Sequence, residues 1–259
     1  VATTGRPGPV LVDIPKDILN YKTSWVEPKL EELPGYKPTL EANPRMIQQA
    51  VELIKNSKKP ILYVGGGIIH SKANQELFEL STKYNIPVVT TLMGRGAFPD
   101  GNDLCIGMPG MHGNYTATTS IQNSDLLIAL GVRFDDRVTA NPKFFAQKAK
   151  VIHADIDPAE IGKVREPEVP IVGDAKSVIK GLIETLGDTE VDTKDWLKEI
   201  KEMKKSYPLS YNQEEKGPLK VPYVLEELQK MSEEDSIVVS GVGQHQMWIS
   251  LHWKFTSPN

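Results

Sequence analysis

The sequence predicts an α/β fold in which helices cover both faces of a doubly wound parallel sheet. Between residues 43 and 186, short apolar runs alternate with segments of helical periodicity, and this alternation is typical of parallel sheets. The apolar runs are continuous, as in DLLIAL at residues 125–130, which indicates strands that are buried on both faces. Each run ends in glycine or in a small polar or charged residue. We therefore predict a Rossmann-like domain whose ligand site lies at the carboxyl ends of the strands.

The composition argues against several classes of function. The net charge of −4 over 259 residues gives no electrostatic attraction for nucleic acid or for an anionic membrane, so neither is expected as a partner. The single cysteine, Cys105, excludes an intrachain disulfide and a cysteine-based zinc site. The sequence contains no apolar run of bilayer-spanning length and no signal-peptide pattern. Because the chain also lacks an initiator methionine, we expect it to be a fragment of a longer polypeptide.

The first 39 residues have the character of a domain end followed by a linker. A loop, GRPGP, precedes a short apolar run at residues 10–14, which predicts a buried strand. A single strand at the end of a chain needs a sheet from elsewhere. Prolines at positions 28, 34 and 38 in a stretch of mixed charge predict a linker that extends to Asn43.

The central part of the chain then alternates helix and strand. A helix is predicted to begin at Asn43, which is followed by proline, and a strand over residues 60–64 leads into three glycines. A helix over 73–84 leads to a strand over 87–91. The glycine-rich stretch 93–113 is predicted to be a long loop, and such loops are usually functional or mobile.

The same alternation continues to residue 186. A short helix over residues 115–123 precedes the strand that starts at Asp125, and further strands are predicted over 150–154 and 169–172. A helix then extends to Leu186.

The end of the chain predicts one more helical segment and a second partial domain. A charged amphipathic helix covers residues 192–207, and a helix over 221–231 precedes a strand over 236–240. One such pair cannot make a domain. The predicted division is a domain end with a linker at 1–39, a central domain at 40–188, a linker at 189–220 and the start of a further domain at 221–259.

The residues that follow the strands are the candidate ligand contacts. Glycines after the first strand and at Gly131 would let backbone amides approach a ligand, and the acids Asp155 and Asp174 suit hydroxyl or amino groups of a nucleotide. Glycine after a strand is also ordinary turn chemistry. Five strands that all end in glycine or in a small polar or charged residue favour an extended ligand such as a dinucleotide.

Nicotinamide dinucleotides and metals fit the sequence poorly. The run GGGIIH contains only the first glycines of G-x-G-x-x-G, and the second strand ends in VTTL without an acid. His112 lies in a glycine-flanked loop, where a ligand contact and a surface imidazole are both consistent with the sequence. The histidines show no metal-ligand spacing, so no metal site is predicted in this chain. For Asp135 and Asp136, an ion pair with Arg133 or Arg137 is favoured over a catalytic carboxylate pair.

Seven motifs carry a resemblance to a known family. GRPGPVLVDIPKD, LYVGGG, TLMGRGAFP, GMHG, GVRFDDRVT, HADIDPAEIGK and GVGQHQMW occur in the order found in the catalytic subunit of acetohydroxyacid synthase, also called acetolactate synthase. Members of this thiamine-diphosphate-dependent family have pyrimidine-binding, central FAD-binding and diphosphate-binding domains. The chain resembles the end of the first, all of the second and the start of the third.

The resemblance implies contacts to two cofactors and a substrate channel. Lys16, Asp136 and Arg137 correspond to residues of the channel, and Val242, Gly243, Gln244 and His245 to contacts with thiamine diphosphate. The implied FAD contacts are Arg6, Gly66, Thr91, Leu92, Gly110, Met111, His112, Gly131, Val132, Arg133, Phe134, Asp135, Asp155, Ile156, Asp174 and Ala175.

The resemblance also implies a reaction, in which two 2-ketoacids condense with loss of CO2 in branched-chain amino-acid biosynthesis. The substrates would be pyruvate and a second pyruvate or 2-ketobutyrate. The fragment alone is expected to be inactive, because the activating glutamate and the segment that binds Mg2+ match no part of it. The full enzyme is expected to form a homo-oligomer, to accept a regulatory subunit and to be cytoplasmic in a bacterium or organellar in a eukaryote.

Two other functions remain open at this point. The first is a pyruvate oxidase or another FAD-containing decarboxylase or carboligase of the same family, although Lys16 together with Asp136 and Arg137 favours the synthase. The second is a non-catalytic module that binds a nucleotide. No catalytic residue is predicted within the chain itself.

Overall fold

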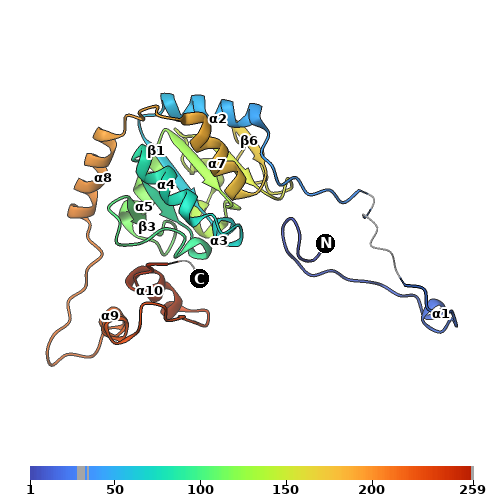
Figure 1. The fold of residues 1–259 in the computed structure, drawn as a ribbon. Helices are drawn as coiled ribbons and strands as arrows, with labels where there is room; N and C mark the ends of the chain where they lie inside the picture. The colour runs from blue at the N-terminus through green and yellow to red at the C-terminus, as the bar shows by residue number, and fades with distance from the viewer. Residues whose placement is uncertain (28–32, 34, 258–259) are drawn as a thin grey trace.

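The computed structural model describes residues 1–27, 33 and 35–257, and its centre is a six-stranded sheet whose strands are all parallel. The strand order is β3-β2-β1-β4-β5-β6, so the chain builds outward from β1 in one direction and then returns to start β4 on its other side (Figure 1). This order is that of a Rossmann fold, and its switch point lies between β1 and β4. The strands are β1 Pro60–Val64, β2 Val88–Thr90, β3 Cys105–Gly107, β4 Leu126–Leu130, β5 Lys150–Asp155 and β6 Val169–Val172.

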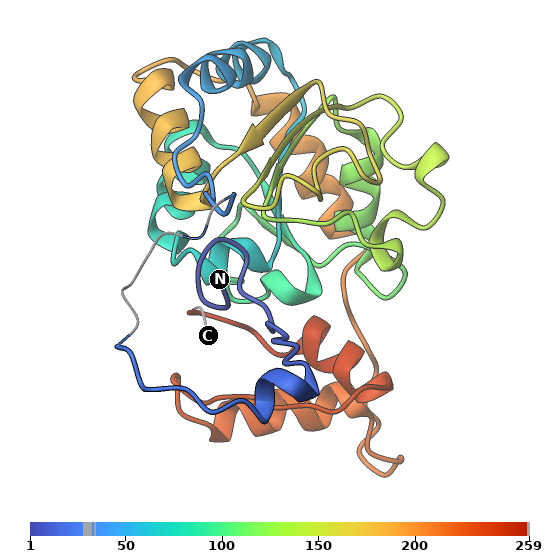
Figure 2. The same cartoon turned by 90° about the vertical axis from the view of Figure 1, so that its right-hand side faces the viewer.

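Helices cover both faces of the sheet, as the sequence predicts. On one face lie α2 (Pro44–Asn56), α4 (Asn74–Tyr84) and α7 (Ala175–Leu186), and on the other lie α5 (Tyr115–Asn123) and α8 (Lys194–Ser206). The remaining helices are α1 Lys16–Leu19, α3 Gly66–His70, η1 Leu92–Gly94, α6 Asp136–Thr139, η2 Pro142–Phe144, α9 Val221–Met231 and α10 Gln244–His252. Figures 1 and 2 show α9 and α10 beyond the edge of the sheet at which α3 lies.

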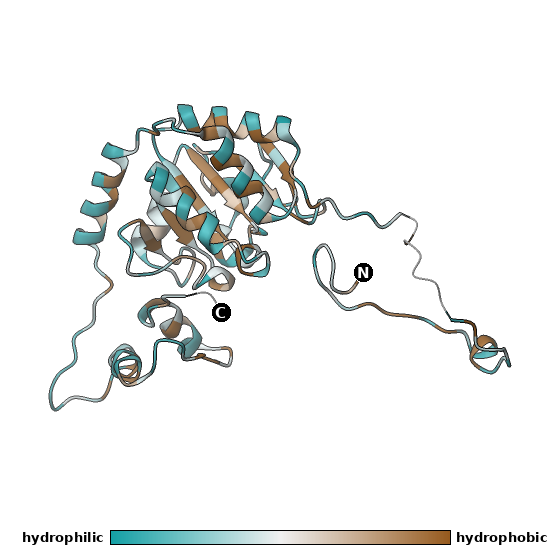
Figure 3. Ribbon diagram, viewed as in Figure 1, coloured by the Kyte–Doolittle hydropathy of each residue, from teal (hydrophilic) through white to brown (hydrophobic). Residues whose placement is uncertain are grey.

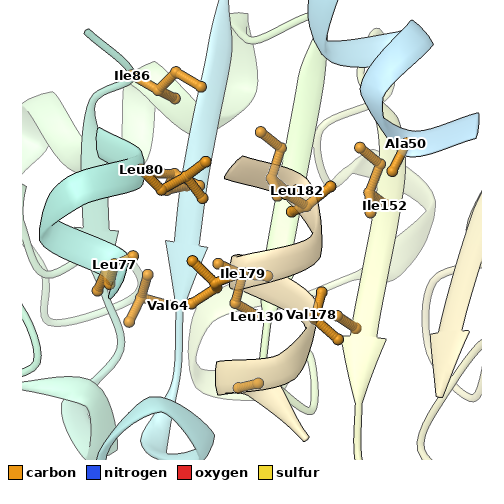
Figure 4. Close-up of a cluster of buried hydrophobic side chains, with 14 of the residues drawn as sticks. Ala50, Val64, Leu77, Leu80, Ile86, Leu130, Ile152, Val178, Ile179 and Leu182 are labelled. Carbon is orange, nitrogen blue, oxygen red and sulfur yellow. The ribbon is translucent and has the colours of Figure 1, made fainter. Parts of the chain in front are cut away.

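The sheet separates two hydrophobic cores. Alternate residues of each strand point to opposite faces, so that Leu62 and Val64 of β1 belong to the core beneath α2, α4 and α7, whereas Ile61 and Tyr63 belong to the other. In Figure 4, strand side chains such as Leu130 interlock with those of α4 and α7 in the first core. Figure 3 shows the same arrangement as apolar strands between helices that are polar on their outer sides.

Side-chain caps start α2 and α5 at the residues where the sequence predicts these helices to begin. Asn43 accepts a hydrogen bond from the backbone N–H of Arg45 at 2.9 Å, and Pro44 occupies the first turn of α2. Asn114 caps α5 by accepting from the N–H of Ala117 at 2.6 Å. These caps and the buried apolar face of α2 confirm the predicted starts.

Two predicted strands do not form. Residues 10–14 and 236–240 have no strand structure, and their apolar side chains are largely exposed, with Leu11 at 91% and Ile237 at 85%. A strand is stable only when its backbone pairs with a neighbour, and the six-stranded sheet provides none for these segments. Within the predicted linker between Asn20 and Asn43, residues 28–32 and 34 lie outside the described residues.

Two further segments differ from the sequence expectation. The predicted loop 93–113 contains the edge strand β3, whose three residues are too few to show a periodicity. The predicted helix at 192–207 is confirmed as α8, and its Trp196 is buried in the second core although the sequence predicts a linker over residues 189–220. The domain limits stay a prediction. Among the described residues, none of the helices combines the length and the apolar character that a bilayer crossing requires.

Candidate functional site

The carboxyl ends of β1 and β4 are held together by glycines. The N–H of Gly65 donates to the carbonyl of Leu130 at 3.1 Å, and the N–H of Gly67 donates to the carbonyl of Gly131 at 3.2 Å. A Cβ atom on Gly65 would lie 2.1 Å from the Gly131 oxygen, and one on Gly67 would lie 2.6 Å from the Gly131 Cα. At Gly65 and Gly67, contact between the two loops by itself requires glycine.

The loops after β1 and β2 also meet at this edge. A Cβ atom on Gly66 would lie 3.3 Å from both the Cβ and the carbonyl oxygen of Met93, so the start of α3 packs against η1. Leu92 and Met93 on η1 are 42% and 68% exposed. Large apolar side chains thus face outward beside Gly66, where they can contact the apolar part of a ligand.

The residues after β4 divide between the surface and the core. Arg133 forms an ion pair with Asp135, with 3.3 Å between Nη2 and Oδ2, and both side chains are about half exposed. For Asp135, this confirms the predicted ion pair with a neighbouring arginine. Phe134, by contrast, has a positive φ of 53° and turns its ring into the second core, where its centroid lies 5.5 Å from that of Tyr63. A ligand at this edge can meet the Phe134 backbone but not its buried ring.

Asp135 also starts the short helix α6. Its Oδ1 accepts from the N–H of Arg137 at 3.2 Å, and this backbone hydrogen bond is the main reason that the pKa of Asp135 lies below its ordinary value. Asp136 and Arg137 are exposed on α6. The predicted cofactor residue Asp135 therefore sets the position of the two predicted channel residues.

The loop after β3 packs on the same short helix. The N–H of Met111 donates to the carbonyl of Arg137 at 2.8 Å, and a Cβ atom on Gly110 would lie 2.5 Å from that oxygen. Gly110 has a φ of 107°, which favours glycine. The side chains of Met111 and His112 are exposed. The structure therefore brings two of the predicted cofactor residues, Gly110 and Met111, against the predicted channel residue Arg137.

The end of β5 carries a buried acid and an ion-pair cluster. Asp155 is buried, its Oδ1 accepts from the N–H of Asp157 at 2.9 Å, and burial raises its pKa. Arg6 reaches this end from the amino-terminal segment, with Nη1 at 2.9 Å from both Asp157 and Glu160. A cavity of about 360 Å³ opens here between Arg6 and Ile156.

Hydrogen bonds from Arg6 hold the pKa values of Asp157 and Glu160 below their ordinary values. Neither acid is among the predicted site residues. The signal that could have found them is the spacing of acids in DIDPAE, directly after a predicted strand.

Asp174 and Ala175 lie at the end of β6, on the start of α7. Asp174 caps that helix by accepting from the N–H of Lys176 at 3.0 Å, so one carboxylate oxygen already has a structural partner. Its backbone N–H donates to the carbonyl of Leu40 at 2.8 Å. This strand end is therefore tied to the segment that leads into α2.

Some predicted residues lie apart from the sheet edge. Lys16 is on α1, which buries none of its residues and lies away from the sheet in Figure 1, so the structure does not bring it to Asp136 and Arg137. Val242 is 91% exposed in the segment that leads into α10. No cluster of three metal-binding side chains occurs within the part of the chain that is described.

His153 lies behind the site on β5 and is fully buried. Its Nε2 lies 2.8 Å from the carbonyl of Val132, which can only accept, so we assign the proton to Nε2. Nδ1 is buried without a hydrogen-bond partner among the described residues. Burial lowers the pKa of this imidazole, which keeps it neutral.

Lowering the pH below 6.5, the ordinary pKa of histidine, is expected to reduce the free energy of unfolding. The unfolded imidazole takes up a proton in that range while the buried His153 resists protonation, so its contribution is complete above that pH and falls with the pH. A His153→Gln variant can still donate to Val132 but does not titrate. When the free energy of unfolding is measured with urea at several pH values, it should fall less steeply with decreasing pH in this variant than in the wild type.

The matched control is His112→Gln, which replaces an exposed imidazole. It should follow the pH dependence of the wild type. Identical slopes for the wild type and His153→Gln would contradict the neutral assignment.

Comparison with known proteins adds a family and its relatives. Residues 47–182 match the family model described as thiamine pyrophosphate enzyme, central domain. The whole chain is 50% identical to "Acetolactate synthase" of Mycobacterium bovis and 51% identical to "Acetolactate synthase large subunit" of Corynebacterium glutamicum, and it covers 42% of each relative. It is 43% identical to "Acetolactate synthase 2, chloroplastic" of Nicotiana tabacum and covers 39% of it. The chain thus spans about two fifths of the length of these relatives.

Proposed function

The chain belongs to the thiamine pyrophosphate enzyme family, and we propose that it is the middle part of an acetolactate synthase. The observation that carries the proposal is the identity of 42% to 51% along the whole chain to acetolactate synthases of bacteria, an archaeon and a plant. The proposed enzyme joins pyruvate to a second 2-ketoacid and releases CO2. This reaction serves branched-chain amino-acid biosynthesis.

The carboxyl edge of the sheet is the proposed site for FAD. Its strand order has the switch point between β1 and β4, where such sheets bind dinucleotides. The exposed residues at this edge also suit the two chemical halves of a flavin dinucleotide. Leu92 and Met111, which are 42% and 61% exposed, offer apolar surface for a ring system, while the exposed guanidinium of Arg133 suits a phosphate.

The buried and capping residues have supporting roles in this proposal. Gly131 keeps the loops after β1 and β4 in contact, and Asp135 holds α6 through its cap. Asp155 and Asp174 each have one carboxylate oxygen engaged by a backbone N–H, which fixes the carboxylate so that the other oxygen can accept from a ligand hydroxyl. Arg6 and Ile156 would contact the same cofactor from the cavity at the end of β5.

Residues 242–245 are the proposed contribution of this chain to thiamine diphosphate binding. Gly243 has a φ of 154°, a conformation that favours glycine, and the absence of a side chain there suits a close approach of the backbone to phosphate. When bound, thiamine diphosphate supplies the electron sink for decarboxylation. The family resemblance places the residues that would hold Mg2+ in a segment of the full enzyme outside this chain.

Substrate and partner assignments complete the proposal. Arg137 and Lys16 are cations that can attract anionic 2-ketoacids toward a channel, with Asp136 beside them. The Corynebacterium relative is named a large subunit, which supports a smaller regulatory partner, and we infer a homo-oligomer for the complete enzyme. The chloroplastic name of the Nicotiana relative supports an organellar location in eukaryotes, with a cytoplasmic location in bacteria.

The activity is tested with the full-length protein that contains this chain. Supplied with thiamine diphosphate, Mg2+, FAD and pyruvate, it should form acetolactate. Consumption of oxygen with formation of acetyl phosphate would instead identify a pyruvate oxidase. The 259-residue chain alone should bind the ADP half of FAD weakly and NAD not at all, and preferential binding of NAD would contradict the site assignment.

Replacing Arg133 by alanine is expected to weaken FAD binding more than replacing Arg137. Arg133 lies in the loop that connects β4 to α6, close to the end of the strand, whereas Arg137 lies farther along the chain, on α6. Loss of a hydrogen bond to a charged group costs about 1.5–3 kcal/mol, so the Arg133→Ala variant should bind FAD at least about tenfold more weakly. Titration of flavin fluorescence on the full-length apoenzyme measures this difference. Equal losses in the two variants would contradict the placement of the phosphate at Arg133.

A further inference from the structure

Arg95 and Asp100 form a buried ion pair in the loop between β2 and β3. Their side chains are only 7% and 12% exposed. The Nη1 of Arg95 also donates to the hydroxyl of Thr90, the last residue of β2, at 3.0 Å. The guanidinium is thus fixed to the sheet edge next to Thr91 and Leu92.

The same pair binds the segment that follows α10. The N–H of Phe255 donates to Oδ2 of Asp100 at 2.8 Å, and the N–H of Asp100 donates to the carbonyl of Phe255 at 3.0 Å. The guanidinium carbon of Arg95 lies 5.1 Å from the centre of the Phe255 ring, a distance at which a cation is attracted to the ring face. One carboxylate oxygen therefore accepts from both Arg95 and Phe255.

The adjacent residue ties this contact to α9. The side-chain amide of Gln229 donates to the carbonyl of Lys254 at 2.7 Å and accepts from its N–H at 3.0 Å. Since α9 and α10 also pack on each other, the two helices and residues 254–255 form one connected unit. Arg95, Asp100 and Phe255 attach this unit to the sheet, and we call these three residues the latch.

We propose that the latch positions the segment 242–245 relative to the carboxyl edge of the sheet, so that it couples the proposed thiamine diphosphate contacts to the proposed flavin loop. Thr91 and Leu92 lie on one side of the latch, and the segment 242–245 enters α10 on the other. Burying a charged pair is costly and adds little stability, whereas its directional bonds specify one geometry. The latch residues are positioning residues, and this role rests on the proposed function of the two sites.

The test uses full-length protein with Asp100→Asn, which keeps the side-chain shape, and Phe255→Leu, which keeps the backbone hydrogen bonds. The control is Asp103→Asn, an exposed acid in the same loop. Amide hydrogen exchange without cofactors should rise about tenfold or more at residues 245–257 in the two latch variants, with no change in β1 and β4. The control should match the wild type.

A second readout separates positioning from a purely structural role. The Kd for thiamine diphosphate, measured with Mg2+ present, should rise about fivefold or more in the latch variants, with unchanged secondary structure. The proposal would be overturned if amide exchange at residues 245–257 did not change, or if it rose equally throughout the sheet. It would also be overturned if a variant with raised exchange bound thiamine diphosphate with an unchanged Kd. Exchange without cofactors does not depend on the reaction, so failure of the latch is distinguishable from an absence of acetolactate formation.

Discussion

Replacing Gly65 by alanine is expected to destabilise the fold by about 3 kcal/mol or more, because the new methyl group cannot be accommodated. Its Cβ would lie 2.1 Å from the carbonyl oxygen of Gly131 and 2.7 Å from a methyl group of Val132. The nearest atom belongs to the backbone at the end of β4, so relief requires β1 and β4 to separate where they are hydrogen bonded through Gly65 and Leu130. Urea unfolding followed by circular dichroism measures the loss.

The matched control is Gly101→Ala. A Cβ atom at Gly101 would have no neighbour within 4 Å, and this variant should stay within about 0.5 kcal/mol of the wild type. Equal effects at the two positions would show that the loops after β1 and β4 do not touch. The comparison therefore tests the packing of Gly65 against Gly131 at the proposed cofactor site.

Replacing Trp196 by alanine should cost about 3–5 kcal/mol, the usual range for removing a buried large aromatic side chain. Trp196 is 1% exposed in the second core, and its Nε1 donates to the carbonyl of Pro60 at the start of β1 at 3.1 Å. Lys59 lies over the ring, with Nζ 5.0 Å from its centre. Truncation would leave both a cavity and an unpaired backbone carbonyl.

Two further variants separate the effect of burial from the effect of the hydrogen bond to Pro60. Trp196→Phe keeps most of the ring volume but loses the donor to Pro60, so its loss should be intermediate. Trp25→Ala removes a side chain that is 81% exposed and should have little effect. A loss at Trp196 no greater than that at Trp25 would mean that α8 is not part of the folded unit.

For α8, the sequence predicts the helix but not the surface against which it packs. The amphipathic pattern predicts a helix at 192–207, and the structure has α8 at Lys194–Ser206. The pattern does not say which surface receives the apolar face of this helix, and a charged helix that is followed by a proline-containing stretch is consistent with a linker. Only the positions of Pro60 and α5 show that Trp196 fills a gap in the second core.

For Gly65 and Gly67, the sequence likewise does not reveal the packing partner. After a strand, glycine is compatible with a tight turn, with a bound ligand or with contact between two loops. The distances at Gly65 and Gly67 select contact between loops, and they involve Gly131, which is more than 60 residues away in the sequence. A local pattern carries no information about such a partner.

The sequence by itself determined the α/β class, the buried strands of the central sheet, the cap at Asn43 and the resemblance that led to the family, because periodicity, capping and motifs act over a few residues. The tertiary structure decided the strand order and the edge strand β3, and it left residues 10–14 unpaired. It also decided that Phe134 turns into the core and that Phe255 meets Arg95 and Asp100. These features depend on pairing and packing between distant segments, which form only when the whole chain is folded.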